Sequence, residues 1–313
     1  MTVAFVFPGQ GSQAVGMGKA LADAYPAARA VFDEVDEALG DKLSAVIWEG
    51  PEDRLTLTEN AQPALMAVSM AVVRALEAEG VSVGEAASYV AGHSLGEYSA
   101  LAAAGALTLS DTAKLLRTRG KAMQAAVPVG EGAMAALLGL DYEKALEVAE
   151  EAAQGEVCQA ANDNAPGQVV VSGARAAVER ACEIATAKGA MKAIMLPVSA
   201  PFHCAMMAPA AEVMRAALAE ADIRAPAVPV VANVAAGPVT DPDEIRRRLV
   251  EQVTGTVRWR ECVQWMAGHG VTELKEIGAG KVLTALARRI DRSLSAAAIG
   301  SPEDIAAFLA SRS

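Results

Sequence analysis

Aromatic residues, histidine and positive charge are scarce in this sequence. Of its 313 residues, only 4% are aromatic and three are histidine, and the formal net charge is −11. Alanine supplies much of the 53% hydrophobic content, which predicts a closely packed, helix-rich core. The negative charge argues against a general nucleic-acid binder, because such a protein needs a basic face. Three histidines argue against a histidine-rich metal site, and we expect no bound metal.

Paired cysteines, a signal peptide and a continuous apolar span are also missing. The cysteines show neither disulfide nor metal-binding spacing, and they are Cys158, Cys182, Cys204 and Cys262. A reduced, cytoplasmic chain is the simplest account of them. The first basic residue is Lys19, which does not fit a secretory signal. The uncharged run 193–211 contains three prolines, so we expect no membrane-spanning helix there.

Two patterns divide the chain. In residues 1–128 and 198–313, short apolar runs alternate with helical patterns, which predicts a large α/β-hydrolase-like domain with a parallel sheet covered on both faces. Residues 129–197 show the order strand, helix, strand, strand, helix, strand, which is typical of a ferredoxin-like (βαββαβ) arrangement. We therefore predict an α/β fold in which a small ferredoxin-like domain is inserted into the large one.

The expected elements follow from periodicity and turn signals. The predicted strands cover residues 3–7, 89–93, 133–140, 157–161, 168–172, 192–196, 228–233 and 273–277. The predicted helices cover residues 26–39, 62–79, 95–104, 111–126, 142–153, 176–188, 243–253, 258–269 and 280–290.

A Gly-x-Ser-x-Gly motif lies between a predicted strand and a predicted helix. It consists of Gly92, His93, Ser94, Leu95 and Gly96. In this context a sharp turn lifts the serine to the carboxyl end of the sheet, and the N-terminus of the next helix faces a developing oxyanion. The motif favours Ser94 as a nucleophile, and the alternative is that Ser94 only caps the helix.

A serine nucleophile needs a base to take its proton. His93 is adjacent to Ser94, so its side chain leaves the strand on the opposite side and fits a supporting role. His269 lies near a predicted helix end, which favours a structural role. His203 lies in the proline-bearing turn SAPFHC and is the best-placed base, although a buried structural histidine is the alternative.

No carboxylate between Ser94 and His203 is clearly placed as the third member of a triad. We interpret the candidates as cap or turn residues, and they are Asp111, Asp141 and Asp163. A backbone carbonyl is the alternative group for orienting the imidazole. This departs from the usual hydrolase pattern.

Six ordered motifs carry a resemblance that covers nearly the whole chain. They are FVFPGQGSQ (Phe5–Gln13), GHSLGEYSAL (Gly92–Leu101), RGKAMQ (Arg119–Gln124), PVSAPFHCAMM (Pro197–Met207), LVEQVTGTVRW (Leu249–Trp259) and EIGAGKVL (Glu276–Leu283). With them the sequence resembles the malonyl-CoA:acyl carrier protein transacylases of fatty-acid synthesis. It is also similar to the acyltransferase domains of polyketide synthases.

The resemblance implies a ping-pong transfer of the malonyl group from malonyl-CoA to the phosphopantetheine thiol of an acyl carrier protein, for fatty-acid or polyketide synthesis. Ser94 would be the nucleophile and His203 the base. The backbone N–H groups of Gln10 and Leu95 would form the oxyanion hole. The backbone carbonyl of Gln252 would orient His203, consistent with the missing triad acid.

The resemblance also assigns substrate-binding positions. Arg119 would hold the free malonyl carboxylate through two parallel hydrogen bonds, which lysine cannot copy. The alternative is a solvent-facing helical arginine, an interpretation that we keep for Arg117. His93 and Asn162 would be supporting positions. Phe202 would crowd the substrate's α-carbon and disfavour an added methyl group by about 1–3 kcal/mol. The alternative is that Phe202 only packs against the turn.

The resemblance implies no metal or redox cofactor, because coenzyme A is part of the substrate. The expected partners are malonyl-CoA and an acyl carrier protein, with no nucleic acid and no membrane, and we expect a monomer. Carrier proteins of this kind are typically acidic, so a local basic patch would have to guide docking. Candidates for that patch are Lys188, Lys192 and Arg288.

Three other functions stay open. A serine hydrolase such as a thioesterase would share Ser94 and His203 and finish with water, but Arg119 and the missing triad acid argue against it. A non-catalytic carrier-binding or scaffold protein would not need the intact set of polar motif residues. An acyltransferase for another extender or starter unit is the third. Plain acetyl is disfavoured because a buried, unpaired guanidinium is costly.

Overall fold

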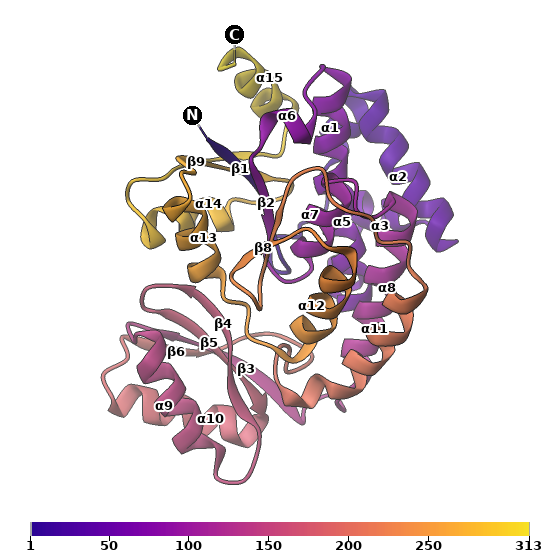
Figure 1. Ribbon diagram of the computed structural model, residues 1–313. Helices are drawn as coiled ribbons and strands as arrows, with labels where there is room; N and C mark the ends of the chain where they lie inside the picture. The colour runs from indigo at the N-terminus through magenta and orange to yellow at the C-terminus, as the bar shows by residue number, and fades with distance from the viewer. Residues whose placement is uncertain (1, 313) are drawn as a thin grey trace.

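The larger of two sheets forms the centre of the molecule (Figure 1). The computed structural model describes residues 2–312. The six strands, in the order β10-β9-β1-β2-β7-β8, are Ser295–Ile299, Glu273–Ile277, Val3–Phe7, Tyr89–Gly92, Val230–Ala232 and Gly237–Val239. Only the β7–β8 pair is antiparallel. The predicted α/β fold with a parallel sheet is therefore confirmed.

Helices cover both faces of this sheet. They are α1 (Lys19–Ala24), α2 (Pro26–Leu39), α3 (Leu43–Glu49), α4 (Glu52–Thr56), α5 (Thr58–Ala78), α6 (Val83–Ala86), α7 (Gly96–Ala103), α8 (Leu109–Ala125), α11 (Ala208–Glu220), α12 (Pro242–Thr254), α13 (Trp259–Gly268), α14 (Val282–Ile290) and α15 (Pro302–Ala310). Figure 1 shows α2, α5 and α8 on one side and α13 and α14 on the other.

Strand β1 is buried on both faces because its side chains alternate between two cores. Phe5 and Phe7 join the core formed with α2, α5 and α8. Ala4 and Val6 join the core that contains Trp259 of α13. The near-continuous apolar sequence of this strand follows from its double burial.

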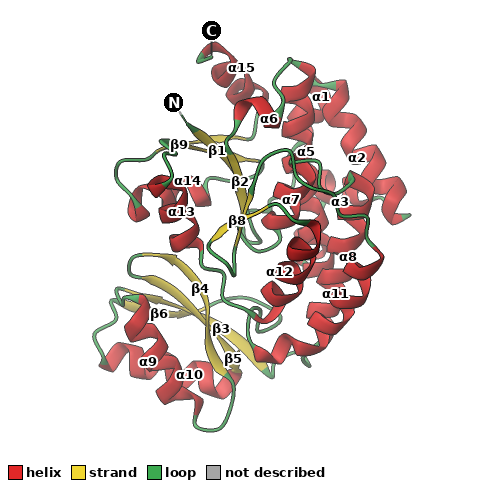
Figure 2. Cartoon of the chain, in the orientation of Figure 1, coloured by secondary structure: helices red, strands yellow, loops and turns green. Residues whose placement is uncertain are grey.

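The smaller sheet is antiparallel and has the strand order β4-β5-β3-β6. In chain order its elements are β3 (Gly132–Leu138), α9 (Tyr142–Ala153), β4 (Cys158–Ala165), β5 (Gln168–Ala174), α10 (Arg175–Ala187) and β6 (Lys192–Met195). Figure 2 shows α9 and α10 together on one face of this sheet. The predicted βαββαβ order is confirmed, while the domain limits at 129 and 197 stay a prediction.

The junction between the sheets is formed by β4 and the segment that joins α12 to α13. The N–H of Asp163 donates to the carbonyl of Val257 at 2.9 Å, and the N–H of Val257 donates to Ala161 at 2.8 Å. Arg260 of α13 forms an ion pair with Asp163 at 2.8 Å. These contacts hold the small sheet against the carboxyl end of the large one.

The interpretation of Asp163 as a turn residue is wrong. It lies inside β4, where it is fully buried, because its ion pair with Arg260 makes burial of the carboxylate tolerable. By contrast, Asp141 caps α9 as predicted, accepting from the N–H of Lys144 at 2.9 Å. The residue that caps α8 is Thr108. Asp111 lies three residues later, in the first turn of the helix, and its carboxylate accepts a hydrogen bond from the hydroxyl of Thr108.

Several observed elements have no counterpart among the predicted ones: α1, α3, α4, α6, α11, α15, β8, β10 and the short 3₁₀ helix Ala205–Met207. Most are too short to establish a period, and the sequence of β10, SAAAI, contains a single β-branched residue among alanines, which do not mark a strand. Within residues 2–312, every helix is too short or too polar to cross a lipid bilayer.

Candidate active site

Ser94 occupies a tight turn between β2 and α7. Its φ of 54° lies in the left-handed region, which few residues with a Cβ adopt. A Cβ on Gly92 would overlap the backbone of Gly96, and one on Gly96 would overlap the carbonyl of Phe7. Both flanking glycines are therefore required by space, and the sharp turn predicted for the motif is present.

His203 lies against Ser94. The Nε2 atom of His203 is 2.7 Å from the Oγ of Ser94, and its Nδ1 is 2.8 Å from the carbonyl oxygen of Gln252. Because a carbonyl can only accept, Nδ1 carries the proton and Nε2 accepts from the serine hydroxyl. Burial, assisted by the charge of Arg119, lowers the pKa of His203 to about 3, so the imidazole is a neutral base at neutral pH.

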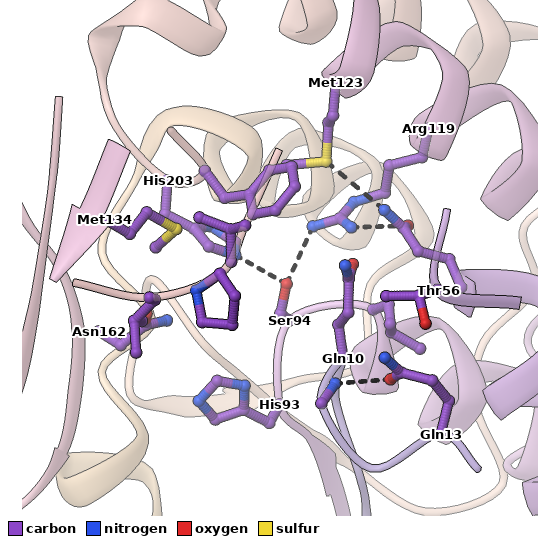
Figure 3. A pocket seen from close by; sticks show the side chains of 17 residues that line it. Gln10, Gln13, Thr56, His93, Ser94, Arg119, Met123, Met134, Asn162 and His203 are labelled. Carbon is purple, nitrogen blue, oxygen red and sulfur yellow. Dashed lines mark hydrogen bonds between the residues drawn. The ribbon is translucent and has the colours of Figure 1, made fainter. Parts of the chain in front are cut away.

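Arg119 projects from α8 into the same place and is only 1% exposed. Its Nη1 donates to the side-chain oxygen of Gln62 at 2.7 Å. Its Nη2 donates to the side-chain oxygen of Gln252 at 2.9 Å and to the Oγ of Ser94 at 3.2 Å. Figure 3 shows Ser94 between Arg119 and His203. The alternative of a solvent-facing Arg119 is wrong.

The interpretation of Arg117 as a solvent-facing arginine is also wrong, because its side chain is only 15% exposed. It is on the same helix, but it donates to the side-chain oxygen of Asn60 at 2.6 Å and pairs with Asp41 at 3.6 Å. It is not among the residues that line the cavity beside Ser94. Its contacts are those of a residue that ties α8 to neighbouring helices.

His93 and Ser94 point in different directions (Figure 3). The Nε2 of His93 is 2.8 Å from the Oδ1 of Asn164, and burial lowers the pKa of this histidine. A supporting position for His93 fits this geometry. Asn162, the other expected supporting residue, lines the cavity from β4, but the partner of the His93 ring is Asn164.

A cavity of about 390 Å³ opens beside Ser94. It is lined by Gln10, Gly11, Gln13, Thr56, Gln62, His93, Ser94, Leu95, Arg119, Met123, Met134, Asn162, Leu196, Pro197, Val198, Phe202 and His203. Every residue predicted for the site lies in this lining except Gln252, which contacts His203 and Arg119 from behind. The oxyanion role of Gln10 and Leu95 stays a prediction, as does the size-selecting role of Phe202.

Asn233 is a site residue that the sequence analysis missed. Its side-chain oxygen accepts from the backbone N–H of Ser94 at 2.8 Å, and its Nδ2 donates to the carbonyl of Gly92 at 2.7 Å. It follows β7, so it fixes the turn from the neighbouring strand. No motif within the predicted strand 228–233 distinguishes it.

Glu97 was missed as well. Its Oε2 accepts from the backbone N–H of Asn233 at 2.9 Å and from the Nε2 of Gln252 at 3.0 Å. Burial raises its pKa to about 7, against the opposing effects of these two hydrogen bonds and of Arg119. A lone carboxyl in the apolar helix that follows Ser94 is the signal that could have revealed it.

Within the described range 2–312, no three or more acidic, cysteine or histidine side chains cluster closely enough to hold a metal ion. The groups that face the cavity are the hydroxyl of Ser94, the neutral imidazole of His203 and the buried guanidinium of Arg119.

Comparisons with known proteins by sequence and by structure point to the same family. Residues 4–301 match the family model described as "Acyl transferase domain". The malonyl CoA-acyl carrier protein transacylase of Bacillus subtilis (strain 168) is 47% identical over 304 residues, which are 97% of this chain and 95% of that protein.

Two solved structures agree with this. The crystal structure of acyl-carrier-protein-S-malonyltransferase from Bartonella henselae is 58% identical, with a TM-score of 0.97 and 99% of each chain covered. A malonyl-transacylase solved in complex with a type II PKS acyl-carrier protein is 44% identical, with a TM-score of 0.96, covering 99% of this chain and 100% of that one.

Proposed function

This chain belongs to the acyl transferase family, and from that premise we propose that it transfers a malonyl group from malonyl-CoA to the phosphopantetheine thiol of an acyl carrier protein. The product serves fatty-acid or polyketide synthesis. The observation that carries the proposal is the buried guanidinium of Arg119, 3.2 Å from the oxygen of Ser94. Such a cation favours an acyl group that carries its own carboxylate.

The first half-reaction forms an ester on Ser94. His203 takes the hydroxyl proton at Nε2 while Oγ attacks the thioester carbonyl. The backbone N–H groups of Gln10 and Leu95 are the predicted oxyanion hole, and they would stabilise the resulting oxyanion. The carbon–sulfur bond then breaks, coenzyme A takes the proton from His203, and a malonyl-serine ester remains.

The second half-reaction runs the same steps in reverse with a new thiol. The phosphopantetheine thiol gives its proton to His203 and attacks the ester. The oxygen of Ser94 leaves and recovers that proton. One base serves both halves, and the hydrogen bond from its Nδ1 to the carbonyl of Gln252 supports the imidazolium in each. Neither step requires a metal or redox cofactor.

Arg119 also separates this function from its rivals. Its partners are the neutral oxygens of Gln62, Gln252 and Ser94, two of which a malonyl carboxylate could replace with a stronger charge-assisted pair. A thioesterase for uncharged acyl groups would have no use for that cation. An acetyl donor would leave it buried without an anion.

Docking of the acidic carrier is expected on the face that carries the cavity mouth. Lys192 begins β6, which leads directly to the lining residues Leu196–Val198. Lys188 is already paired with Glu151 at 2.9 Å and Glu147 at 3.9 Å, so its charge is largely neutralised. Of the two lysines, Lys192 is the better candidate, and Arg288 remains with it.

The test is the intact mass of the protein after brief mixing with malonyl-CoA. We expect a malonyl-sized increment on the native protein that a pantetheine thiol removes faster than water does. Ser94→Ala should show no increment and Arg119→Ala a strongly reduced one. Free malonate without an increment would favour the hydrolase, and absence of both would refute malonyl transfer.

A further inference from the structure

Glu97 is a buried carboxyl that neither half-reaction uses. It lies on α7 three residues after Ser94 and is 2% exposed. Its Oε2 accepts from Gln252 Nε2 at 3.0 Å, and the oxygen of that same amide accepts from Arg119 at 2.9 Å. One side-chain amide therefore links the carboxyl to the guanidinium.

Arg119 has no carboxylate in direct contact. Its hydrogen-bond acceptors within the described chain are the oxygens of Gln62, Gln252 and Ser94, all neutral. A buried charge is costly without a counterion. Glu97 is the carboxyl whose charge acts on Arg119, so it is suited to compensate the guanidinium while the cavity holds no substrate.

The other titratable groups near this pair keep one protonation state. Tyr98 on α7 and Cys262 on α13 interact with Glu97, and burial raises the pKa of both, so they stay neutral. His203 stays neutral because its pKa is lowered. Glu97, whose pKa burial raises to about 7, is the group here that can exchange a proton near neutral pH.

We propose that Glu97 is the resting counterion of Arg119 and takes up one proton from solvent when the malonyl carboxylate binds to that arginine. This rests on the proposed function, since it requires a carboxylate-bearing acyl group. Two carboxylates would then share one guanidinium. Repulsion between their like charges raises the pKa of the carboxyl that is held less closely by the guanidinium, which is Glu97. The malonyl group, in direct contact, keeps its charge, and Glu97 becomes neutral.

The pH dependence has a definite sign. As pH rises through 7, free Glu97 loses its proton, and malonyl binding must put that proton back. Affinity for malonyl-CoA therefore falls as pH rises, by up to about tenfold per unit, until the raised pKa of the bound state is passed. Acetyl-CoA carries no carboxylate and should show no such fall.

Glu97→Gln isolates the charge. The variant's side-chain oxygen can accept the same hydrogen bonds from Asn233 and Gln252, while it can neither ionise nor take up a proton. Ser94→Ala serves as the background for binding, because it prevents acylation.

The experiment is calorimetric titration of Ser94→Ala with malonyl-CoA near pH 7.5, in two buffers of different ionisation enthalpy. Because a carboxyl with a pKa of about 7 is about three-quarters ionised at this pH, we expect uptake of about three-quarters of a proton per ligand beyond that measured with acetyl-CoA. The comparison removes protons exchanged by the coenzyme A phosphates. In Ser94→Ala/Glu97→Gln the excess should vanish, and affinity at pH 8 should exceed that of the parent.

Equal excess uptake in both proteins would overturn the inference and leave malonyl transfer intact. If the double variant does not fold, infrared difference spectra of Ser94→Ala decide the matter. Malonyl-CoA should produce the band of a protonated carboxyl and acetyl-CoA should not, and a missing band would overturn the inference. Failure of malonyl-CoA to bind at all would refute the proposed function and, with it, this inference.

Discussion

At the scale of the residue, the two groups proposed to react are both held in strained backbone. Ser94 has a φ of 54° and His203 a φ of 58°, a conformation that costs a residue with a Cβ about 1–3 kcal/mol. Their side chains meet at 2.7 Å. The surrounding hydrogen bonds to Asn233 and Gln252 offset that strain, which places the hydroxyl and the imidazole in contact before any substrate arrives.

The first prediction concerns the shape of the cation. Arg119→Lys keeps the charge but cannot make two parallel hydrogen bonds to a carboxylate. We expect kcat/KM for malonyl-CoA to fall about 30- to 100-fold, because one charge-assisted hydrogen bond is worth roughly 2–3 kcal/mol. Use of acetyl-CoA should change far less.

Steady-state acylation assays with both donors measure this. The matched control is Arg117→Lys on the same helix, whose side chain contacts Asn60 and Asp41 outside the cavity lining. Its kcat/KM should stay within about twofold of the native value. A similar loss in both variants would mean that α8 is merely destabilised and that Arg119 does not hold the carboxylate.

At the scale of the element, the close approach of α5 and α8 decides where Arg119 lies. Gly120 follows Arg119, and a Cβ on it would lie 2.5 Å from the Cα of Glu59 and 2.6 Å from the carbonyl of Thr58. The absent side chain lets the helices meet, so that Gln62 of α5 reaches the guanidinium at 2.7 Å. A glycine in this helix therefore serves the site through packing.

Gly120→Ala should push α8 away from α5. Because both obstructing atoms are backbone, we expect a loss of about 1–3 kcal/mol in the free energy of unfolding and a lower melting temperature. KM for malonyl-CoA should rise as Arg119 leaves Gln62. Gly268→Ala on α13 is the control, since nothing lies within 4 Å of its added Cβ. An unchanged melting temperature for Gly120→Ala would contradict this packing argument.

At the scale of the whole molecule, the cavity is assembled from both sheets. Ser94 and Arg119 come from the large sheet and its helices, whereas Met134 of β3 and Asn162 of β4 come from the small one. The pairing of β4 with Val257 and the Asp163–Arg260 ion pair hold these walls together. The mouth of the cavity thus lies where a carrier protein can contact both parts.

Charge reversal at Lys192 should weaken carrier docking alone. This protein has a formal net charge of −11, and its carrier is expected to be acidic as well, so a local positive charge on the enzyme should aid association. For Lys192→Glu we expect KM for the carrier to rise about fivefold, the effect of roughly 1 kcal/mol, while KM for malonyl-CoA stays unchanged. The control is Arg292→Glu, because Arg292 precedes the amino end of β10 and therefore lies at the end of the large sheet away from the cavity. Equal changes in both Michaelis constants would refute a docking role for Lys192.

The sequence alone determined the local features of this protein. The helix Pro26–Leu39 and the strand Glu273–Ile277 have the predicted bounds, because periodic burial leaves its pattern in the sequence. The βαββαβ order is local in the same sense. The motifs also indicated Ser94, His203 and Arg119, because a nucleophile, a base and a group that binds a carboxylate each require a specific residue type within a recognisable motif.

Only the tertiary structure decided which side chains surround these three. Gln62 and Asn233 lie outside every motif, and the motif that contains Glu97 does not reveal which side chains this carboxyl contacts. The amide of Gln252 donates to the backbone carbonyl of Ser94, 158 residues away. Such contacts depend on the path of the whole chain, and local periodicity says nothing about that path. Burial has the same origin, and it is burial that makes His203 a neutral base and gives Glu97 a proton to exchange.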